Sequence, residues 1–547
     1  MRIKCGERDR WVGVWARAGL IFTLLVFIGL GLVIGPTSAW AGRALHKRGG
    51  NPDPHPRTRQ LLVNLALSSF VSASSSSPNQ PAVNATDGDA ATSWSPGQNR
   101  GELIVDLHRP RHLGGIGLTL GKNSDATVSV AVADRPGHWQ VVPSLQKRSL
   151  PAGQPVAFPL PKNLANARYV RLTVIGSDGK VPTVAEFRLF GVDRHTRSMA
   201  LGADLSFELE EERVGNKFTD LDGQVLPPHQ IMRRHGANYA RLRLWVDPPG
   251  GYNNLASDLA MAKGIKAAGM KLLLNIHYSD FWADPGKQII PRAWQGQDLT
   301  TLERTVENYT RQVIAAFAAQ GTPVDMVQIG NEITNGILWP LGKVEGNQGW
   351  DSFVALLKAG IRGAIKGSPP NHRPRIMLHI DQGGNNKVCR NFFDHIIAED
   401  VPFDIIGLSY YPFWHGSLSD LRQNVNDLAT RYGKDIIIVE TQYPWTLENG
   451  DDTPNFVWTE SQLPAGYPAS PRGQISFVND LLSILAQVPG DRGAGIFYWE
   501  PEWIPGVGWE PGAGTPNDNL TLFDFRGRAL PSIKIYGNPV ETLQVNE

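Results

Sequence analysis

The fold of this 547-residue chain is decided by two short segments, Gln328-Ile329-Gly330-Asn331-Glu332 and Ile437-Ile438-Val439-Glu440-Thr441. In each segment a run of apolar residues ends at a glutamate and is followed by loop-like sequence. This pattern is typical of a parallel strand that is buried on both faces and stops at a loop. Because the carboxyl ends of the strands of a closed parallel barrel surround one mouth, we expect Glu332 and Glu440 to lie close together.

The part of the chain around these segments alternates strand-like and helix-like patterns. Amphipathic stretches such as Asp258–Ala268, Leu302–Ala319 and Trp350–Lys366 are typical of helices that cover a sheet. Eight β/α units in roughly 340 residues predict an α/β fold, the (β/α)8 TIM barrel. The eight predicted strands are Gly202–Ser206, Tyr239–Trp245, Lys271–His277, Met326–Glu332, Ile376–Ile380, Asp404–Tyr411, Asp435–Thr441 and Gly493–Glu500.

The region before the barrel, residues 61–192, has almost no helical periodicity. It consists of short β-rich runs, such as Thr127–Val132 and Tyr169–Val174, separated by turn residues. This pattern predicts an all-β jelly-roll sandwich. A short polar joint at Asp193–Arg197 predicts that the sandwich folds alone and that its removal leaves the chemistry of the barrel intact.

The first 41 residues have the pattern of a secretory signal peptide. A basic start precedes the apolar run Leu20–Ile34, and Ala39-Trp40-Ala41 supplies the small-residue pattern of a cleavage site. An uncleaved signal anchor is the alternative, because the apolar run approaches membrane-spanning length. Residues 42–60 are polar and rich in proline and glycine, which predicts a flexible linker. We expect the body of the protein to be secreted or periplasmic, and free of the membrane after cleavage.

Charge and cysteine content exclude several classes of protein. The chain has 53 Lys and Arg and 52 Asp and Glu residues, so nothing in it predicts binding to nucleic acid. Of its two cysteines, Cys5 lies in the predicted signal peptide, and Cys389 remains alone. The mature protein therefore has no intrachain disulfide, and we interpret Cys389 as a free structural thiol.

The predicted pair of carboxyl groups has a specific chemical meaning, because glycoside hydrolysis uses two of them across a sugar ring. In the retaining reaction one carboxyl donates a proton while the other attacks the anomeric carbon, at a separation of about 5–5.5 Å. The amide of Asn331 can donate to a sugar 2-hydroxyl, which favours Glu332 as the acid/base and Glu440 as the nucleophile. No cofactor is required. Alternatively, each glutamate caps a helix or pairs with an arginine.

The other predicted strand ends carry side chains suited to sugar binding. Aromatic rings stack on the apolar faces of sugars, and polar groups between them bind hydroxyls. Aromatic residues follow four strands, and packing alone does not account for this repetition. The substrate-binding candidates are Asn331, Arg241, His277, Tyr411, Trp499 and Trp282.

These motifs together resemble glycoside hydrolase family 53, the arabinogalactan endo-β-1,4-galactanases. The resemblance implies a monomeric, endo-acting, retaining enzyme in residues 200–540 that cleaves β-1,4-galactan, with Glu332 as acid/base and Glu440 as nucleophile. The motifs are GAD at 202–204, RLRLW at 241–245, HYSDFWADPG at 277–286, QIGNEI at 328–333, GLSYYPFWHG at 407–416, VET at 439–441, FYWEP at 497–501 and LFDF at 522–525.

The predicted sandwich is similar to the coagulation factor 5/8 type C, or discoidin, fold, which also occurs in family 32 carbohydrate-binding modules. The similarity is carried by ATDGDAATSW at 85–94, VDL at 105–107, ARYVRL at 167–172 and AEFRLFG at 185–191. It implies a structural Ca²⁺ ion, for which the candidate ligands are Asp87, Asp89, Thr92 and Glu186. Trp94 and Trp139 are predicted to be core residues rather than sugar platforms.

A second possible Ca²⁺ position and two rival functions remain open. Some family 53 members carry Ca²⁺ in the last barrel loops, where Asp518, Asn517 and Asn519 offer oxygen ligands. Another β-1,4-glycanase of the same clan, a mannanase or xylanase, would show the same two glutamates. A non-catalytic glycan-binding protein with a decayed barrel is the other rival, and intact Glu332 and Glu440 argue against it.

Overall fold

The computed structural model of the protein describes residues 62–192, 199–510 and 512–537. The predicted signal peptide (1–41), linker (42–60) and joint (193–197) lie outside the described residues. Within them, an all-β part is followed along the chain by an α/β part. The predicted fold class is confirmed.

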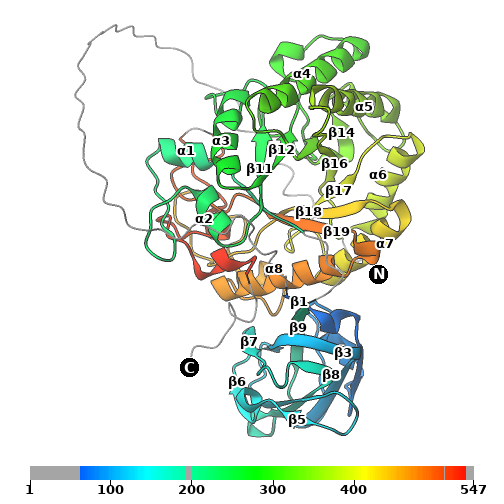
Figure 1. The fold of residues 1–547 in the computed structure, drawn as a ribbon, viewed down its shortest axis with the longest axis vertical. Coiled ribbons are helices and arrows are strands. Elements are labelled where there is room, and N and C mark those ends of the chain that lie inside the picture. The colour runs from blue at the N-terminus through cyan, green and yellow to red at the C-terminus, as the bar shows by residue number, and fades with distance from the viewer. Residues whose placement is uncertain (1–61, 193–198, 511, 538–547) are drawn as a thin grey trace, which may run out of the picture. The chain divides into compact units, whose positions relative to one another are not determined.

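The α/β part is a closed barrel of eight parallel strands, as the sequence predicts (Figure 1). Neighbouring strands pair in chain order, and β19 closes the ring against β10. All eight predicted strands are present, most of them within one to three residues of the predicted bounds. The strands are β10 (Ala200–Asp204), β11 (Tyr239–Leu244), β12 (Lys271–Ile276), β13 (Met326–Ile329), β16 (Arg375–Ile380), β17 (Ile405–Ser409), β18 (Asp435–Thr441) and β19 (Gly493–Tyr498).

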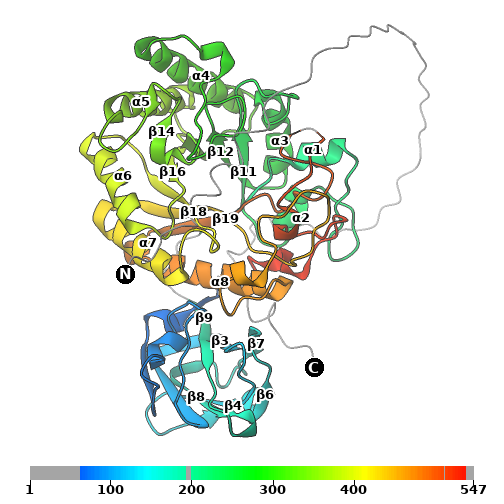
Figure 2. The ribbon, with the colours of Figure 1, turned by 180° about the vertical axis from the view of Figure 1, so that it is seen from behind.

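Helices surround the barrel strands, as Figures 1 and 2 show from two sides. Polar N-caps begin several of them: Asn254, Asp298 and Ser417 each accept a hydrogen bond from the backbone N–H three residues later. In the described ranges, no helix combines the length and apolar character needed to cross a membrane. The helices are α1 (Glu208–Arg213), α2 (Pro228–Arg234), α3 (Leu255–Ala267), α4 (Leu299–Ala319), α5 (Trp350–Gly367), α6 (Asn386–Ala398), α7 (Leu418–Tyr432) and α8 (Pro471–Ala486).

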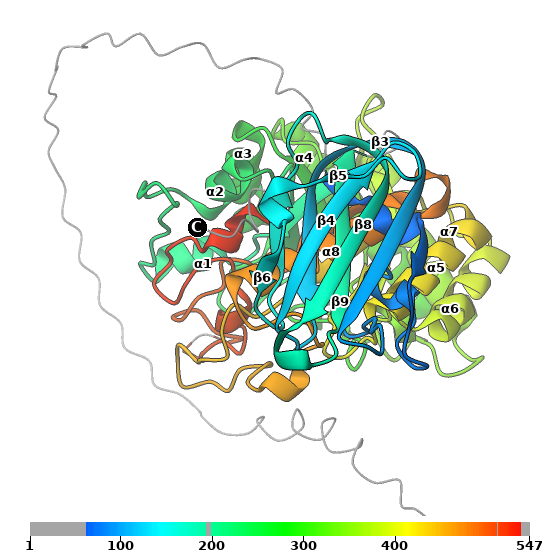
Figure 3. The ribbon, with the colours of Figure 1, turned by 90° about the horizontal axis from the view of Figure 1, so that it is seen from below.

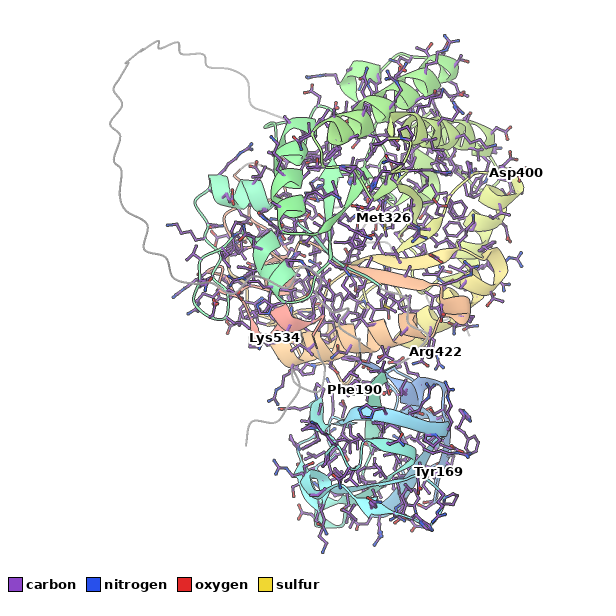
Figure 4. The ribbon with its side chains drawn as sticks, in the orientation of Figure 1. Tyr169, Phe190, Met326, Asp400, Arg422 and Lys534 are labelled. Carbon is purple, nitrogen blue, oxygen red and sulfur yellow. The ribbon has the colours of Figure 1, made fainter. Side chains whose placement is uncertain are left out.

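The interior of the barrel is filled with side chains rather than open. Met326, labelled in Figure 4, packs there with Met377 and Phe497. Gly202 makes room for Phe497, because a Cβ at position 202 would lie 2.2 Å from the ring. A short ribbon, β14 (Gly336–Ile337) and β15 (Gly342–Lys343), follows β13. Because the interior is packed, we expect the reactive groups at the carboxyl ends of the strands.

The all-β part is an antiparallel sandwich with its own core. The long strand β3 serves both sheets: its first half pairs with β2 and β8, and its second half with β7 and β9. Figure 3 shows β4, β8 and β3 side by side. The strands are β1 (Leu62–Asn64), β2 (Phe70–Ala73), β3 (Arg100–Leu120), β4 (Ala126–Ala133), β5 (Gln140–Val141), β6 (Arg148–Leu150), β7 (Val156–Pro159), β8 (Asn166–Gly176) and β9 (Val184–Val192).

The two tryptophans predicted for the sandwich core differ. Trp94 is fully buried, which confirms the prediction. Trp139 is only partly buried, and the guanidinium of Arg171 lies 4.5 Å from its ring centre. The core prediction is therefore wrong for Trp139, whose ring is only partly buried and packs against the guanidinium of Arg171.

The sandwich and the barrel share a buried ion pair that the sequence did not predict. Arg188 of β9 donates through Nε to Oδ1 of Asp480 on α8 at 2.7 Å, and its Nη2 donates to the second oxygen. Tyr467 donates to the same carboxylate, and Arg188 also donates to Thr119. Both charged side chains are at most 1% exposed. Arg422 of α7, labelled in Figure 4, adds a hydrogen bond to the Leu67 carbonyl.

Cys389 is buried in α6 and is a free cysteine in the described part of the chain. Its thiol lies 3.1 Å from the carbonyl of Gln382. Burial raises the pKa of the Cys389 thiol to about 12, so the thiol stays protonated and unreactive at neutral pH.

Candidate active site

The mouth of the barrel is formed by sharp turns at the ends of its strands. Gly330 follows β13 with φ of 79°, and a Cβ there would lie 2.5 Å from Ile333. Glu332 has φ of 46°, Tyr278 after β12 has 54° and Glu500 after β19 has 42°. Left-handed conformations are strained for these residues and cluster at functional sites. Not all of these side chains enter the mouth, because the hydroxyl of Tyr278 contacts Thr310 of α4 at 2.7 Å.

Glu332 and Glu440 face each other across this mouth. One carboxylate oxygen of each, together with a ring nitrogen of His379, lie within 4.8 Å of one another. Ser409 lies between them, with its Oγ 2.6 Å from Glu332 and 3.4 Å from Glu440. Barrel closure therefore brings together two residues that the chain keeps far apart.

Glu440 is held by a cation and a phenol. Arg241 contacts Oε1 of Glu440 at 2.8 Å, and the hydroxyl of Tyr411 donates to Oε2 at 3.2 Å. Burial raises the pKa of Glu440 above its ordinary value, while the charge of Arg241 opposes that rise. Both donors favour the carboxylate form, which is the form a nucleophile needs.

Glu332 has a different electrostatic environment. Burial raises the pKa of Glu332 well above its ordinary value, and the charges of Glu440 and Asp381 raise it further. In the described residues no Lys or Arg forms an ion pair with Glu332. Glu332 therefore retains its proton, whereas Glu440 loses its proton more readily.

A hydrogen-bond network around Arg241 fixes Asn331. Arg241 donates to Asp204 at 2.6 Å and to Oδ1 of Asn331 at 3.1 Å. Asn275 and Gln328 also donate to that Oδ1, and Nδ2 of Asn331 donates to the Ala283 carbonyl. The second N–H of Nδ2 has no partner in these contacts, and the donation of Asn331 to a sugar hydroxyl stays a prediction.

His277 lies beneath the mouth rather than on its surface. It is 2% exposed, and its Nδ1 accepts from the N–H groups of Trp245 and Ala283. Its Nε2 is 3.1 Å from the amide of Asn275. Burial, with the charge of nearby arginines, keeps the pKa of His277 well below its ordinary value. The structure thus gives His277 a role in orienting the loop after β12, and direct contact with substrate stays a prediction.

An aromatic wall lines one side of the mouth. Trp282 packs at 4.5 Å against Trp509 and at 6.2 Å against Trp499. Arg243 lies 4.0 Å from the centre of the Trp282 ring. The indole nitrogen of Trp282 is buried and has no hydrogen-bond partner among the described residues. The predicted Trp282 and Trp499 therefore share one wall, to which Trp509 and Phe207 are additions.

Glu500 is not part of the facing pair. It accepts from Arg243 at 2.6 Å, and burial raises its pKa to about 8. The next acid, Glu502, is fully buried and neither of its oxygens has a hydrogen-bond partner. Glu500 therefore pairs with the arginine that lies against the Trp282 ring.

Several residues of the mouth were absent from the sequence prediction. Ser409, His379 and Asp204 each lie within two residues of the end of a predicted strand, so the strand-end rule could have included them. Gln328 and Trp509 had no comparable signal, because their roles depend on which neighbours closure of the barrel gives them.

The candidate metal positions differ in how well they converge. Among the described residues, Glu332, His379 and Glu440 are the one group of three acidic or imidazole side chains whose ligand atoms lie together. Both nitrogens of that histidine are already engaged, and Arg241 balances Glu440. The predicted sandwich ligands Asp87, Asp89 and Glu186 do not form such a group.

The predicted sandwich ligands instead have partners of their own. The hydroxyl of Thr92 donates to Asp87 at 2.7 Å, and Asp89 accepts from the N–H of Ala91. Glu186 accepts from Gly88 through one oxygen, and its other oxygen is buried without a partner. Burial raises the pKa of Asp87 to about 6.

A closed parallel barrel with two facing glutamates, an arginine beside one of them and an aromatic wall defines the class of barrel enzymes that act on glycosidic bonds. Residues 200–536 match the profile described as Glycosyl hydrolase family 53, and residues 70–187 match the F5/8 type C domain. The chain belongs to glycosyl hydrolase family 53. Both resemblances predicted from the sequence are confirmed.

Individual relatives agree with this assignment. A protein of Niallia circulans, described as an uncharacterized protein in the bgaB 5' region, is 47% identical over 61% of this chain and 92% of its own length. A probable arabinogalactan endo-beta-1,4-galactanase A of Neosartorya fischeri is 38% identical over 61% of this chain and 92% of its own. The solved GH53 catalytic domain of Ignisphaera aggregans is 38% identical, with a TM-score of 0.59, and covers 63% of this chain and 96% of that domain.

Proposed function

We propose that this protein is an arabinogalactan endo-β-1,4-galactanase that hydrolyses its substrate by double displacement with retention of configuration. The observation that carries the proposal is the pair Glu332 and Glu440, with Arg241 and Tyr411 on Glu440 alone. The relatives' names and the family assignment support β-1,4-galactan as the substrate.

Each carboxyl has a defined part in the proposed reaction. Protonated Glu332 donates its proton to the glycosidic oxygen while ionised Glu440 attacks the anomeric carbon, so the bond to the leaving sugar breaks as the bond to Glu440 forms. In the second step Glu332, now ionised, takes a proton from water, which displaces Glu440. Asn331 binds the sugar 2-hydroxyl, and the rings of Trp282 and Trp499 bind the apolar faces of the chain.

A substrate panel tests this proposal. The purified protein is incubated with β-1,4-galactan, mannan and xylan, and the first-formed anomer is followed by proton NMR. We expect galactan to be cleaved at internal bonds with a β-configured first product. Preferential cleavage of mannan or xylan would assign the chain to another β-1,4-glycanase activity. Binding to galactan without any cleavage would make it a glycan-binding protein.

The proposed location is outside the cytoplasm, secreted or periplasmic, and the proposed state is a monomer. The pattern of residues 1–41 and a polysaccharide substrate support the location. Fractionation of the native host, with size-exclusion chromatography of the purified protein, measures both.

The sandwich is proposed to attach the enzyme to insoluble pectic material. Tethering raises the local substrate concentration without a new catalytic contact. The partly exposed Trp139 ring is the side chain to test, because sugars stack on such rings. Trp139→Ala should weaken attachment to insoluble material and leave turnover of soluble galactan unchanged. Unchanged attachment would make the sandwich a spacer.

The last barrel loops offer more buried oxygens without partners for a structural Ca²⁺ ion than the predicted sandwich position does. Asp518, Asn517 and Asn519 each have a buried side-chain oxygen without a partner, and such oxygens are the ligands Ca²⁺ prefers. At the sandwich position only Glu186 has one. Ca²⁺ should raise the melting temperature of the protein, and Asp518→Asn should lessen that rise more than Asp87→Asn. The reverse order would favour the sandwich position.

A further inference from the structure

The hydroxyl of Ser409 lies between the two glutamates. Ser409 is the last residue of β17 and is fully buried. The ladder between β17 and β18 shifts register at this residue and pairs it with Glu440. A local irregularity of this kind re-aims a strand side chain. Here it brings one hydroxyl within reach of both carboxyls.

His379 is oriented by Gln328. The amide nitrogen of Gln328 lies 2.7 Å from the side-chain oxygen of Asn275 and 3.0 Å from the Gly330 carbonyl, so that nitrogen is a donor. The same nitrogen is 3.0 Å from Nδ1 of His379, and the backbone N–H of Glu332 points at Nδ1 from 3.4 Å. Nδ1 is therefore an acceptor, and the ring proton is on Nε2.

This proton determines how Ser409 bonds. Nε2 of His379 is 2.8 Å from the Ser409 oxygen. Burial, followed by the charge of Arg241, keeps the pKa of His379 well below its ordinary value, so the ring is neutral and its Nε2–H donates. Because the Ser409 oxygen accepts from His379, the single proton of Ser409 is left for a carboxylate.

The two glutamates depend on Ser409 unequally. Glu440 also forms an ion pair with Arg241 and accepts a hydrogen bond from Tyr411. Among the described residues, Ser409 is the one side chain that donates to the carboxyl of Glu332. Removal of the hydroxyl therefore leaves Glu440 with two donors and Glu332 with none.

We propose that Ser409 is a positioning residue whose hydroxyl, oriented by His379, donates to Glu332 and stabilises the ionised form of Glu332 in the glycosyl-enzyme. This inference rests on the proposed double displacement. The O–H bond of Ser409 stays intact, so no proton passes through it. In the glycosyl-enzyme Glu440 is an ester, and the hydrogen bond from Ser409 stabilises ionised Glu332 as the base of the second step.

The sign of the pH effect follows from this role. The charged and titratable groups that face Glu332 are Glu440, Asp381, Asp284 and His379. Those that face Glu440 are Arg241, Asp204 and Tyr411. They are all retained in Ser409→Ala. Loss of the donor raises the pKa of Glu332 in the glycosyl-enzyme. Because the second step needs ionised Glu332, the acid limb of kcat moves to higher pH.

The test separates the two chemical steps with a nitrophenyl β-1,4-galactobioside. Its good leaving group makes the second step limiting, so kcat reports that step and kcat/KM reports the first. Ser409→Ala should lower kcat by about ten- to a hundredfold, the effect of one hydrogen bond to a charged group, and change kcat/KM by less than about fivefold. Azide, which needs no base, should restore kcat. Ser409→Thr, which retains the hydroxyl, should recover most of kcat.

Controls keep a folding defect apart from the proposed role. Ser476→Ala removes another buried hydroxyl, on α8 and away from the mouth, and should leave both constants unchanged. If Ser409→Ala does not fold, His379→Gln is measured instead and should show the same loss of kcat. Equal losses of kcat and kcat/KM without azide rescue would make Ser409 structural. An inverted first product from the wild type would overturn the proposed function itself.

Discussion

The mouth of the barrel and the contact between the sandwich and α8 both bury charged side chains, but the two regions differ in how fully those side chains are paired. At the contact, Arg188 and Asp480 form a bidentate ion pair. Arg188 also donates to Thr119, and Asp480 also accepts from Tyr467. At the mouth, carboxyls outnumber the arginines, and Glu500 and Glu502 keep buried oxygens without partners.

The difference between the two regions distinguishes structure from chemistry. A satisfied buried pair has one protonation state over the physiological range and holds two elements together. Carboxyls that are crowded, buried and unequally paired have pKa values pushed away from the ordinary value and from one another, which general acid–base catalysis requires. Substitutions in the two regions should accordingly affect different measurements.

The largest effect is expected for Glu440→Ala. Loss of the nucleophile should lower galactan turnover on the order of 10⁴- to 10⁶-fold, with little change in stability. Azide should enter the vacated space and restore turnover with the opposite anomer, measured by NMR. Retained activity without azide rescue would show that another carboxyl is the nucleophile, and Glu500 is the next candidate.

Arg188→Met should have the opposite profile. It leaves Asp480 buried without its cation, and breaking such a pair costs about 3–5 kcal/mol of unfolding free energy. Chemical denaturation measures this loss, and turnover of the folded protein should be unchanged. The matched double change Arg188→Met with Asp480→Leu should recover most of the stability. A normal unfolding midpoint in the single variant would show that the pair is not buried in solution.

Tyr411→Phe should have a smaller effect on the chemistry. It removes one donor to Glu440 and leaves Arg241, so we expect a fall in kcat/KM of about tenfold. Loss of a donor to the charged form raises the pKa of Glu440 further. Since the first step needs ionised Glu440, the acid limb of kcat/KM should move to higher pH. A shift to lower pH would contradict the assignment of Glu440 as nucleophile.

Glu500→Gln should have the smallest effect, on the pH dependence of stability. The folded protein binds a proton at Glu500 up to about pH 8, whereas the ordinary value is 4.5. Stability from this group is therefore fully present below the ordinary pKa and is lost as pH rises towards 8. Denaturation at pH 5 and pH 8 should show a smaller difference in the variant. Glu460→Gln, at an exposed position, is the control and should match the wild type.

The success of the sequence prediction depended on the range of the interactions involved. The eight strands were predictable because an apolar run bounded by turns is a local signal. Glu332 and Glu440 were predictable because strand ends share a mouth in any such barrel. Trp139 was predicted wrongly, since burial depends on which neighbours the sheet supplies, and Trp509 was missed because it lies in a loop outside the strand pattern.

The amino-acid sequence by itself determined the order of strands and helices, the two carboxylates at strand ends and the division into a sandwich and a barrel. The tertiary structure alone decided how far each carboxyl holds its proton, because that depends on Arg241, Tyr411 and Ser409 arriving from other strands. It also decided that Arg188 of the sandwich meets Asp480 of α8. Such contacts join residues far apart in the chain, and they exist only after closure and burial have removed water from between them.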